Sequence, residues 1–117
     1  MRIISGKFKT RLIKTPSNNS IRPTSDRARE MIFNTLNSLL IKDKKKITGQ
    51  AIIDCFCGTG ALGIEALSRG AEHVTFIDSS NESLNLCRKN CQELKIIQNV
   101  KIVKLDIIKD KFPKFKD

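Results

Sequence analysis

Several features are missing or scarce in this 117-residue sequence, and each absence excludes a class of protein. No apolar run is long enough to span a bilayer, and the first residues lack the apolar core of a secretory signal peptide. The single histidine, His73, has no cysteine or histidine at metal-ligand spacing beside it, which disfavours a catalytic or metal role. Because the four cysteines come without a secretory segment, we expect reduced thiols and a soluble, cytoplasmic protein.

Positive charge, in contrast, is abundant. The formal net charge is +10 and the sequence pI is about 9.8, which favours a polyanionic partner such as nucleic acid. A merely well-solvated basic surface is the alternative. The length allows one domain at most, and it is small for a complete doubly wound α/β fold.

The most informative stretch is residues 51–69, where a short apolar run ends in Asp54 and is followed by a glycine-rich loop. Apolar residues then recur at helical spacing, so the pattern predicts a strand, a tight turn and a helix. Gly58 and Gly60 allow the sharp turn, and Gly63 allows the helix to pack closely on the sheet. This arrangement is typical of a nucleotide-cofactor site, although a glycine turn without a ligand has the same pattern.

Two cofactors fit the loop. The spacing Gly58-x-Gly60-x-x-Gly63, with Asp78 ~20 residues after the first glycine, also satisfies the dinucleotide fingerprint. Asp54 argues against it, because a carboxylate there would repel a diphosphate and would suit an ammonium group. S-adenosylmethionine has an ammonium for Asp54, a carboxylate for the amides near Gly58 to Gly60, and ribose hydroxyls for Asp78.

Two further strands are expected at residues 74–77 and 100–105, ending in Asp78 and Asp106. With Asp54, these residues place three carboxylates at the strand ends where open α/β sheets bind ligands. Ser79-x-x-Glu82 predicts a capping box that opens a helix between them. The apolar stripe of that helix contains two cysteines, which we interpret as small core residues; a metal site shared with the cysteines of the loop is the alternative. The stripe consists of Leu84, Cys87, Cys91 and Leu94.

The N-terminal part is basic. Residues 1–16 alternate cationic and apolar positions around Gly6 and predict a small hairpin or extended arm, either RNA-binding or a sheet edge protected by lysines. A helix is expected from Thr24 or Ser25 to about Leu40, with Arg27, Arg29 and Glu30 opposite its buried stripe. That predicted stripe comprises Ala28, Met31, Ile32, Leu36, Leu39 and Leu40. Residues 42–46 are expected to form a solvated connector.

Three blocks of this sequence together carry a family resemblance: residues 1–8 (MRIISGKF), 22–30 (RPTSDRARE) and 54–71 (DCFCGTGALGIEALSRGA). The chain resembles the bacterial 16S rRNA guanine-N2 methyltransferase family (RsmD) over nearly its whole length. The resemblance implies a class I S-adenosylmethionine-dependent methyltransferase with a Rossmann-like α/β fold, here with an incomplete sheet. It also implies methylation of a guanine exocyclic amine in 16S ribosomal RNA of the small subunit.

These arguments define the expected organisation. Residues 1–48 form the hairpin and first helix, and residues 49–117 form the first half of the methyltransferase domain. The expected cofactor-binding residues are Asp54, Phe56, Cys57, Gly58, Thr59, Gly60, Asp78, Ser79, Asp106, Ile107, Arg22 and Thr24, the last two by resemblance to a segment that closes over the cofactor. The expected RNA-binding residues are Arg2, Lys7, Lys9, Arg11 and Lys14; no metal is expected.

One part of the family pattern is missing from this sequence. Such enzymes hold the target amine with an Asn/Asp-Pro-Pro-Tyr/Phe turn, but no Pro-Pro pair, tyrosine or tryptophan occurs here. We therefore expect no catalytic residue in this chain, an exposed strand at residues 51–55, and self-association or a second polypeptide that supplies the missing half. A non-catalytic RNA-binding protein and a dinucleotide-binding domain stay open as alternatives.

Overall fold

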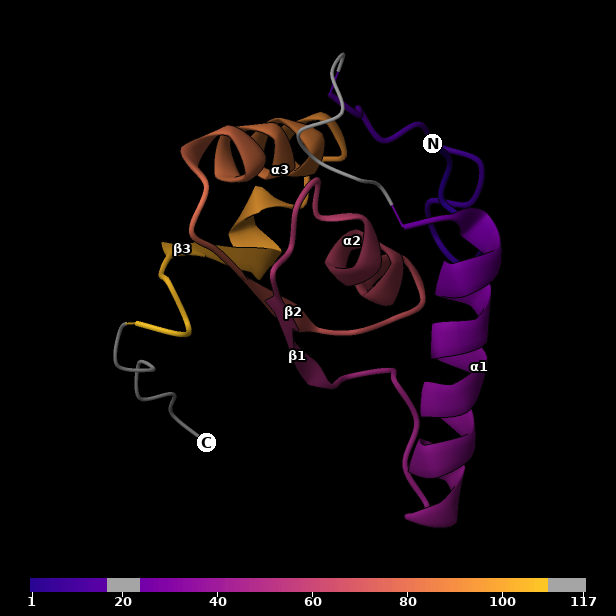
Figure 1. Cartoon of the computed structure of the whole chain (residues 1–117). Coiled ribbons are helices and arrows are strands. Elements are labelled where there is room, and N and C mark those ends of the chain that lie inside the picture. The colour runs from indigo at the N-terminus through magenta and orange to yellow at the C-terminus, as the bar shows by residue number, and fades with distance from the viewer. Residues whose placement is uncertain (17–23, 110–117) are drawn as a thin grey trace.

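The structure, a computed structural model, describes residues 1–16 and 24–109. These residues form a three-stranded parallel sheet with the strand order β1-β2-β3, and helices connect its strands (Figure 1). The strands are β1 (Ala51–Cys55), β2 (His73–Asp78) and β3 (Val100–Lys104). The helices are α1 (Asp26–Lys42), α2 (Ala61–Ser68), α3 (Asn81–Glu93) and the short 3-10 helix η1 (Ile97–Asn99).

Both crossovers step in the same direction along the sheet, so α2 and α3 cover the same face (Figure 1). On the other face the register places Ile53 beside Thr75, and Thr75 beside Lys101. Within the described residues β1 is an edge strand, as predicted, and Ile53 is 43% exposed. The sheet matches the first half of the expected Rossmann-like fold.

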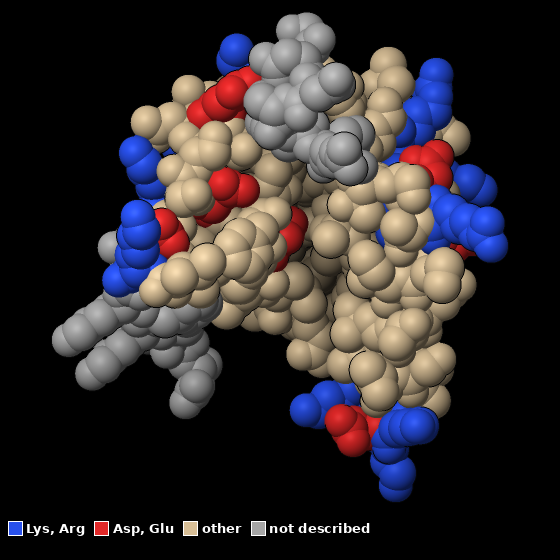
Figure 2. Space-filling model, in the orientation of Figure 1, with Lys and Arg blue, Asp and Glu red and all other residues tan. Residues whose placement is uncertain are grey.

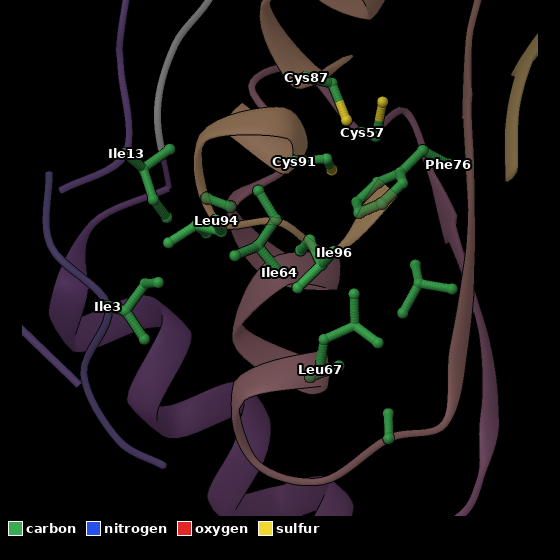
Figure 3. Packing of buried hydrophobic residues seen from close by; sticks show 14 of the residues in the cluster. Ile3, Ile13, Cys57, Ile64, Leu67, Phe76, Cys87, Cys91, Leu94 and Ile96 are labelled. Atoms are coloured by element: carbon green, nitrogen blue, oxygen red, sulfur yellow. The ribbon is translucent and has the colours of Figure 1, made fainter. Parts of the chain in front are cut away.

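The core lies between the sheet and the α2–α3 layer (Figure 3). Gly63 brings α2 into close contact with β2, since a Cβ at this position would lie 2.3 Å from Cε1 of Phe76. The predicted stripe of α3 is confirmed, because all four of its residues are buried. Its cysteines are core residues, and among the described residues no group of three or more potential ligands could hold a metal ion.

The N-terminal residues form the expected narrow hairpin, which an antiparallel bridge between Arg2 and Leu12 closes. Ile3 and Ile13 point into the same buried cluster as the sheet residues (Figure 3). The hairpin is therefore packed on the α/β unit, and the two predicted segments share one core. Among the described residues no helix is long and apolar enough to cross a membrane.

The orientation of α1 differs from the prediction. Arg29 is fully buried with Phe33, whereas Met31 is 61% exposed and Leu39 is 55% exposed. The reason is tertiary, because Arg29 meets the fully buried carboxylate of Glu65 on α2 and also pairs with Asp26. A charge can be buried when it is paired and hydrogen-bonded. The predicted stripe is therefore right in part: Leu36 and Leu40 pack against the core, whereas Met31 and Leu39 are exposed and Arg29 is buried in their place.

Helix ends agree with the sequence to within one or two residues. Ser25 caps α1 by accepting from the Ala28 amide, and Gly70 follows α2 with a positive φ of 114°. The cap of α3 is Ser80, whose hydroxyl accepts from the Ser83 amide, so the predicted capping box at Ser79 is wrong by one residue. The Asp78 side chain occupies the preceding position of this turn, where it accepts from the Ser80 amide.

Candidate cofactor and RNA site

The loop between β1 and α2 has an unusual backbone. Phe56, Gly58 and Gly60 all have positive φ values of 58°, 55° and 88°. A side chain at Gly60 would be strained by this left-handed conformation and would also meet the Cys87 sulfur, which would lie 2.7 Å from a Cβ. Phe56 adopts the same region despite its bulk and is 68% exposed, and strain of this kind is typical of functional loops.

Asp78, at the end of β2, fixes this loop. One carboxylate oxygen accepts from the Gly58 amide at 3.0 Å, and the other accepts from the Ser80 amide at 2.9 Å. Each oxygen keeps a further lone pair, so the carboxylate can still accept hydrogen bonds from the hydroxyls of a ligand. The sequence predicted the position of Asp78 but not this second role.

Asp54 lies at the end of β1 and is nearly buried. Its Oδ2 atom accepts from the Gly63 amide at 3.0 Å, so this carboxylate also stabilises the first turn of α2. Burial raises the pKa of Asp54 to about 6; the Gly63 hydrogen bond opposes this change, and the negative charge of Asp78 adds to it. Asp54 is thus poised to ionise fully when a cation approaches.

Asp106 follows β3, the third strand. Its Oδ1 atom accepts from the Ile108 and Lys109 amides, and the adjacent Leu105 amide donates to the carbonyl of Asp78 at 3.0 Å. The third predicted carboxylate therefore lies beside the second one along the sheet edge. Ile107, in the same turn, is half-buried, as is Thr24 just before α1. Arg22 lies outside the described residues.

The remaining loop residues separate into buried and exposed positions. The Thr59 side chain is buried, and the Cys57 side chain points into the core beside Cys87 and Cys91 (Figure 3). Hydrogen bonds with Cys57 and Cys91, together with burial, raise the pKa of the Cys87 thiol, so this sulfur is an unreactive packing group. Only the backbone of Cys57 is then left for a ligand, whereas Ser79 is exposed.

The five basic residues predicted to bind RNA are all exposed: Arg2, Lys7, Lys9, Arg11 and Lys14. Figure 2 shows Lys and Arg side chains gathered near the hairpin and again at the far end of α1. Lys14 forms an ion pair with Glu93 at 2.7 Å, and the Lys7 ammonium lies over the ring of Phe8 at 5.4 Å. Phe8 itself packs against the core, so its ring is only partly accessible to a base.

An apolar groove of about 150 Å³ runs between α1 and β1, and it is visible as a hollow in Figure 2. Asp54 and Gly63 are among the residues that line this groove, so the groove reaches the carboxyl end of β1. The remaining lining residues are apolar or small: Ile32, Phe33, Leu36, Ile52, Ile53, Cys55, Leu62 and Ala66.

The sequence analysis missed several buried polar residues, and two of them hold the hairpin. Glu65 on α2 accepts from the backbone amides of Ile4 and Ser5, and Asn90 on α3 bonds to Lys14. The available signal was a polar residue beside an apolar stripe, as Asn90 is beside Cys87 and Cys91.

The comparisons with known proteins agree with this geometry. Residues 1–115 match the family described as Conserved hypothetical protein 95. The chain belongs to this family. It is 38% identical to Ribosomal RNA small subunit methyltransferase D of Escherichia coli K12, over 81% of this chain and 44% of that protein. It is 36% identical to the YlbH protein of Bacillus subtilis, over 91% of this chain and 54% of that protein.

A solved structure shares the fold. The yhhF protein of E. coli superimposes with a TM-score of 0.72 at 36% identity, covering 89% of this chain and 51% of that one. The expected class I methyltransferase fold and the family resemblance are therefore confirmed. The chain spans about half the length of the curated relatives that it matches.

Proposed function

We propose that this chain binds S-adenosylmethionine for methylation of a guanine N2 amine in 16S ribosomal RNA. The observation that carries the proposal is the pair of strand-end carboxylates, Asp54 and Asp78, on either side of a left-handed glycine loop. Family membership supports it, because one relative is named a small-subunit ribosomal RNA methyltransferase. The cofactor, when bound, supplies an electrophilic methyl group.

In this proposal each part of the cofactor meets a different part of the loop. Asp78 accepts from the ribose hydroxyls with its remaining lone pairs, and Asp54 faces the ammonium group. The Gly58 and Gly60 amides are already engaged, by Asp78 and by the carbonyl of Cys57. The cofactor carboxylate therefore accepts hydrogen bonds from the Thr59 amide and from the first amides of α2.

The outer residues complete this cofactor site. Asp106 and Ile107 lie one strand further along and suit the adenine side, while exposed Phe56 and Ser79 flank the loop. Arg22 and Thr24 are assigned here from the family resemblance alone.

The hairpin is the proposed RNA-binding element. Its cationic side chains are exposed while its backbone is fixed to α2, so it can follow a phosphate backbone without ordering on binding. The substrate would be the small ribosomal subunit or its 16S RNA. Binding through phosphates requires an affinity that falls steeply with salt.

The groove between α1 and β1 is the proposed docking site for a second polypeptide that holds the target base. β1 has unpaired backbone groups on its outer edge within the described part of the chain, and the groove beside it is apolar. A partner that adds a parallel strand to β1 would satisfy these groups. It would also bring its own residues next to Asp54.

Calorimetric titration of the chain with S-adenosylmethionine tests the cofactor assignment, with NADH as the competing ligand. We expect saturable binding of the first ligand only, and at least a tenfold weaker affinity in Asp78→Asn. Asp43→Asn is the matched control, because Asp43 is exposed at the C-terminal end of α1, which lies away from the loop (Figure 1). If a folded chain binds neither ligand but still binds RNA, the cofactor proposal is wrong and an RNA-binding role replaces it.

A further inference from the structure

A single buried side chain joins the hairpin to the glycine loop. Asn90 of α3 is only 2% exposed. Its Oδ1 atom accepts from the Lys14 amide at 2.8 Å, and its Nδ2 atom donates to the Lys14 carbonyl at 3.1 Å. The same Nδ2 atom donates to the carbonyl of Thr59 at 3.1 Å. Both hydrogens of the amide group and its oxygen are therefore used.

These bonds fix the peptide group between Thr59 and Gly60 at both ends. Asn90 holds the carbonyl of this group, while its N–H, on Gly60, donates to the Cys57 carbonyl at 2.9 Å. The preceding peptide group carries the Thr59 amide, and fixing the peptide between Thr59 and Gly60 restricts the backbone on the C-terminal side of that amide. Asn90 thus holds a residue of the proposed cofactor site in place without reaching the cofactor itself.

At its other end Asn90 fixes a basic residue. The Lys14 backbone is held by two hydrogen bonds to Asn90, and the Lys14 ammonium pairs with Glu93 three residues further along α3. A phosphate that attracts Lys14 competes with Glu93 for this ammonium. Any shift of the Lys14 backbone leaves buried donors or acceptors of Asn90 unsatisfied, which is costly.

We infer that Asn90 is a positioning residue that couples RNA binding on the hairpin to cofactor binding at the glycine loop. The inference rests on the proposed function, because it needs both ligands. Since coupling between two sites is reciprocal, RNA changes the affinity for S-adenosylmethionine by the same factor as the cofactor changes the affinity for RNA. The link works through one amide group, so its loss removes the coupling rather than either site.

The test measures the dissociation constant of S-adenosylmethionine with and without saturating 16S ribosomal RNA. In the unmodified chain we expect the two values to differ by about fivefold or more, the lower end of typical couplings. In Asn90→Ala and Asn90→Asp the ratio of these two dissociation constants should fall to within about twofold of one. Asn90→Asp keeps the size of the side chain and an acceptor for the Lys14 amide, but it loses the donors to Thr59 and Lys14.

Cys91→Ala is the matched control, because it removes the sulfur of a fully buried side chain on the same helix. This variant should lower stability but leave the ratio of the two dissociation constants unchanged. If Asn90 had a merely structural role, its own variants would give the same result. An unchanged ratio in both Asn90 variants, or a ratio near one in the unmodified chain, overturns the inference. If the unmodified chain does not bind the cofactor at all, the proposed function fails instead.

Discussion

At the scale of single residues, two strand-end carboxylates each have two roles. Asp54 and Asp78 stand where a cofactor is expected, and both also hold backbone amides of the loop or of the helix after it. An acid that binds its own backbone is oriented before a ligand arrives, which lowers the cost of binding. The same bonds make these residues part of the fold, so substitutions there affect stability as well as affinity.

The raised pKa of Asp54 predicts how stability depends on pH. The unfolded chain loses this proton near pH 4, whereas the folded chain keeps it until about pH 6. The unfolded state therefore binds fewer protons between these values, and stability falls as the pH rises through this window. At about 1.4 kcal/mol per pH unit, the loss reaches up to about 3 kcal/mol.

Asp54→Asn keeps an acceptor for the Gly63 amide and removes the titration. We expect urea unfolding to show that the free energy of unfolding of the variant rises relative to that of the unmodified chain between pH 4 and pH 7, by up to about 3 kcal/mol. The other ionisable groups cancel in this difference. Parallel stability curves would show that Asp54 has an ordinary pKa.

At the scale of elements, the hairpin is held by a buried carboxylate. Glu65 accepts from Ile4 and Ser5 at 2.9 and 3.1 Å and pairs with Arg29 and Arg69 at 3.3 and 2.9 Å. Gly6 lets the hairpin backbone approach α2 closely, because a Cβ at this position would lie 2.0 Å from the carbonyl oxygen of Ser68. Residues from three elements thus meet at one charge on α2.

Replacing this charge tests its role. Glu65→Gln leaves the buried Arg29 with less compensation, so we expect a loss of about 3 kcal/mol in the free energy of unfolding. Glu93→Gln is the control, since its pair with Lys14 is about half exposed and contributes less than about 1 kcal/mol. Urea unfolding measures both, and hydrogen exchange should show lost protection at Ile4 and Ser5. Equal costs for the two variants would contradict the prediction.

The elements also show what a sequence can and cannot predict. The strands, the glycine loop and α3 follow from local patterns, because their apolar residues and glycines act on near neighbours. The burial of Arg29 on α1 does not follow, because the buried carboxylate that it meets, that of Glu65, is 36 residues away in the sequence. The link from Asn90 to Lys14 and Thr59 depends on tertiary contacts in the same way.

At the scale of the whole molecule, an apolar surface lies beside the open edge of the sheet. Residues of β1 (Ile52, Ile53) and of α1 (Ile32, Leu36) line the same groove. An open, apolar strand edge is a template for pairing with another chain. This side is where the proposed second polypeptide would bind, and without it a second copy of the chain can take its place.

We therefore expect the chain alone to self-associate at micromolar concentration, with sedimentation velocity showing species larger than a monomer. Ile53→Lys places a charge on β1 and should shift the chain toward monomer without unfolding it, because Ile53 is already partly exposed. Leu39→Lys adds the same charge on the outward face of α1 and should change association less. If Leu39→Lys alone restores the monomer, the helix face and not the β1 edge drives association; a monomeric unmodified chain would show that neither surface is adhesive.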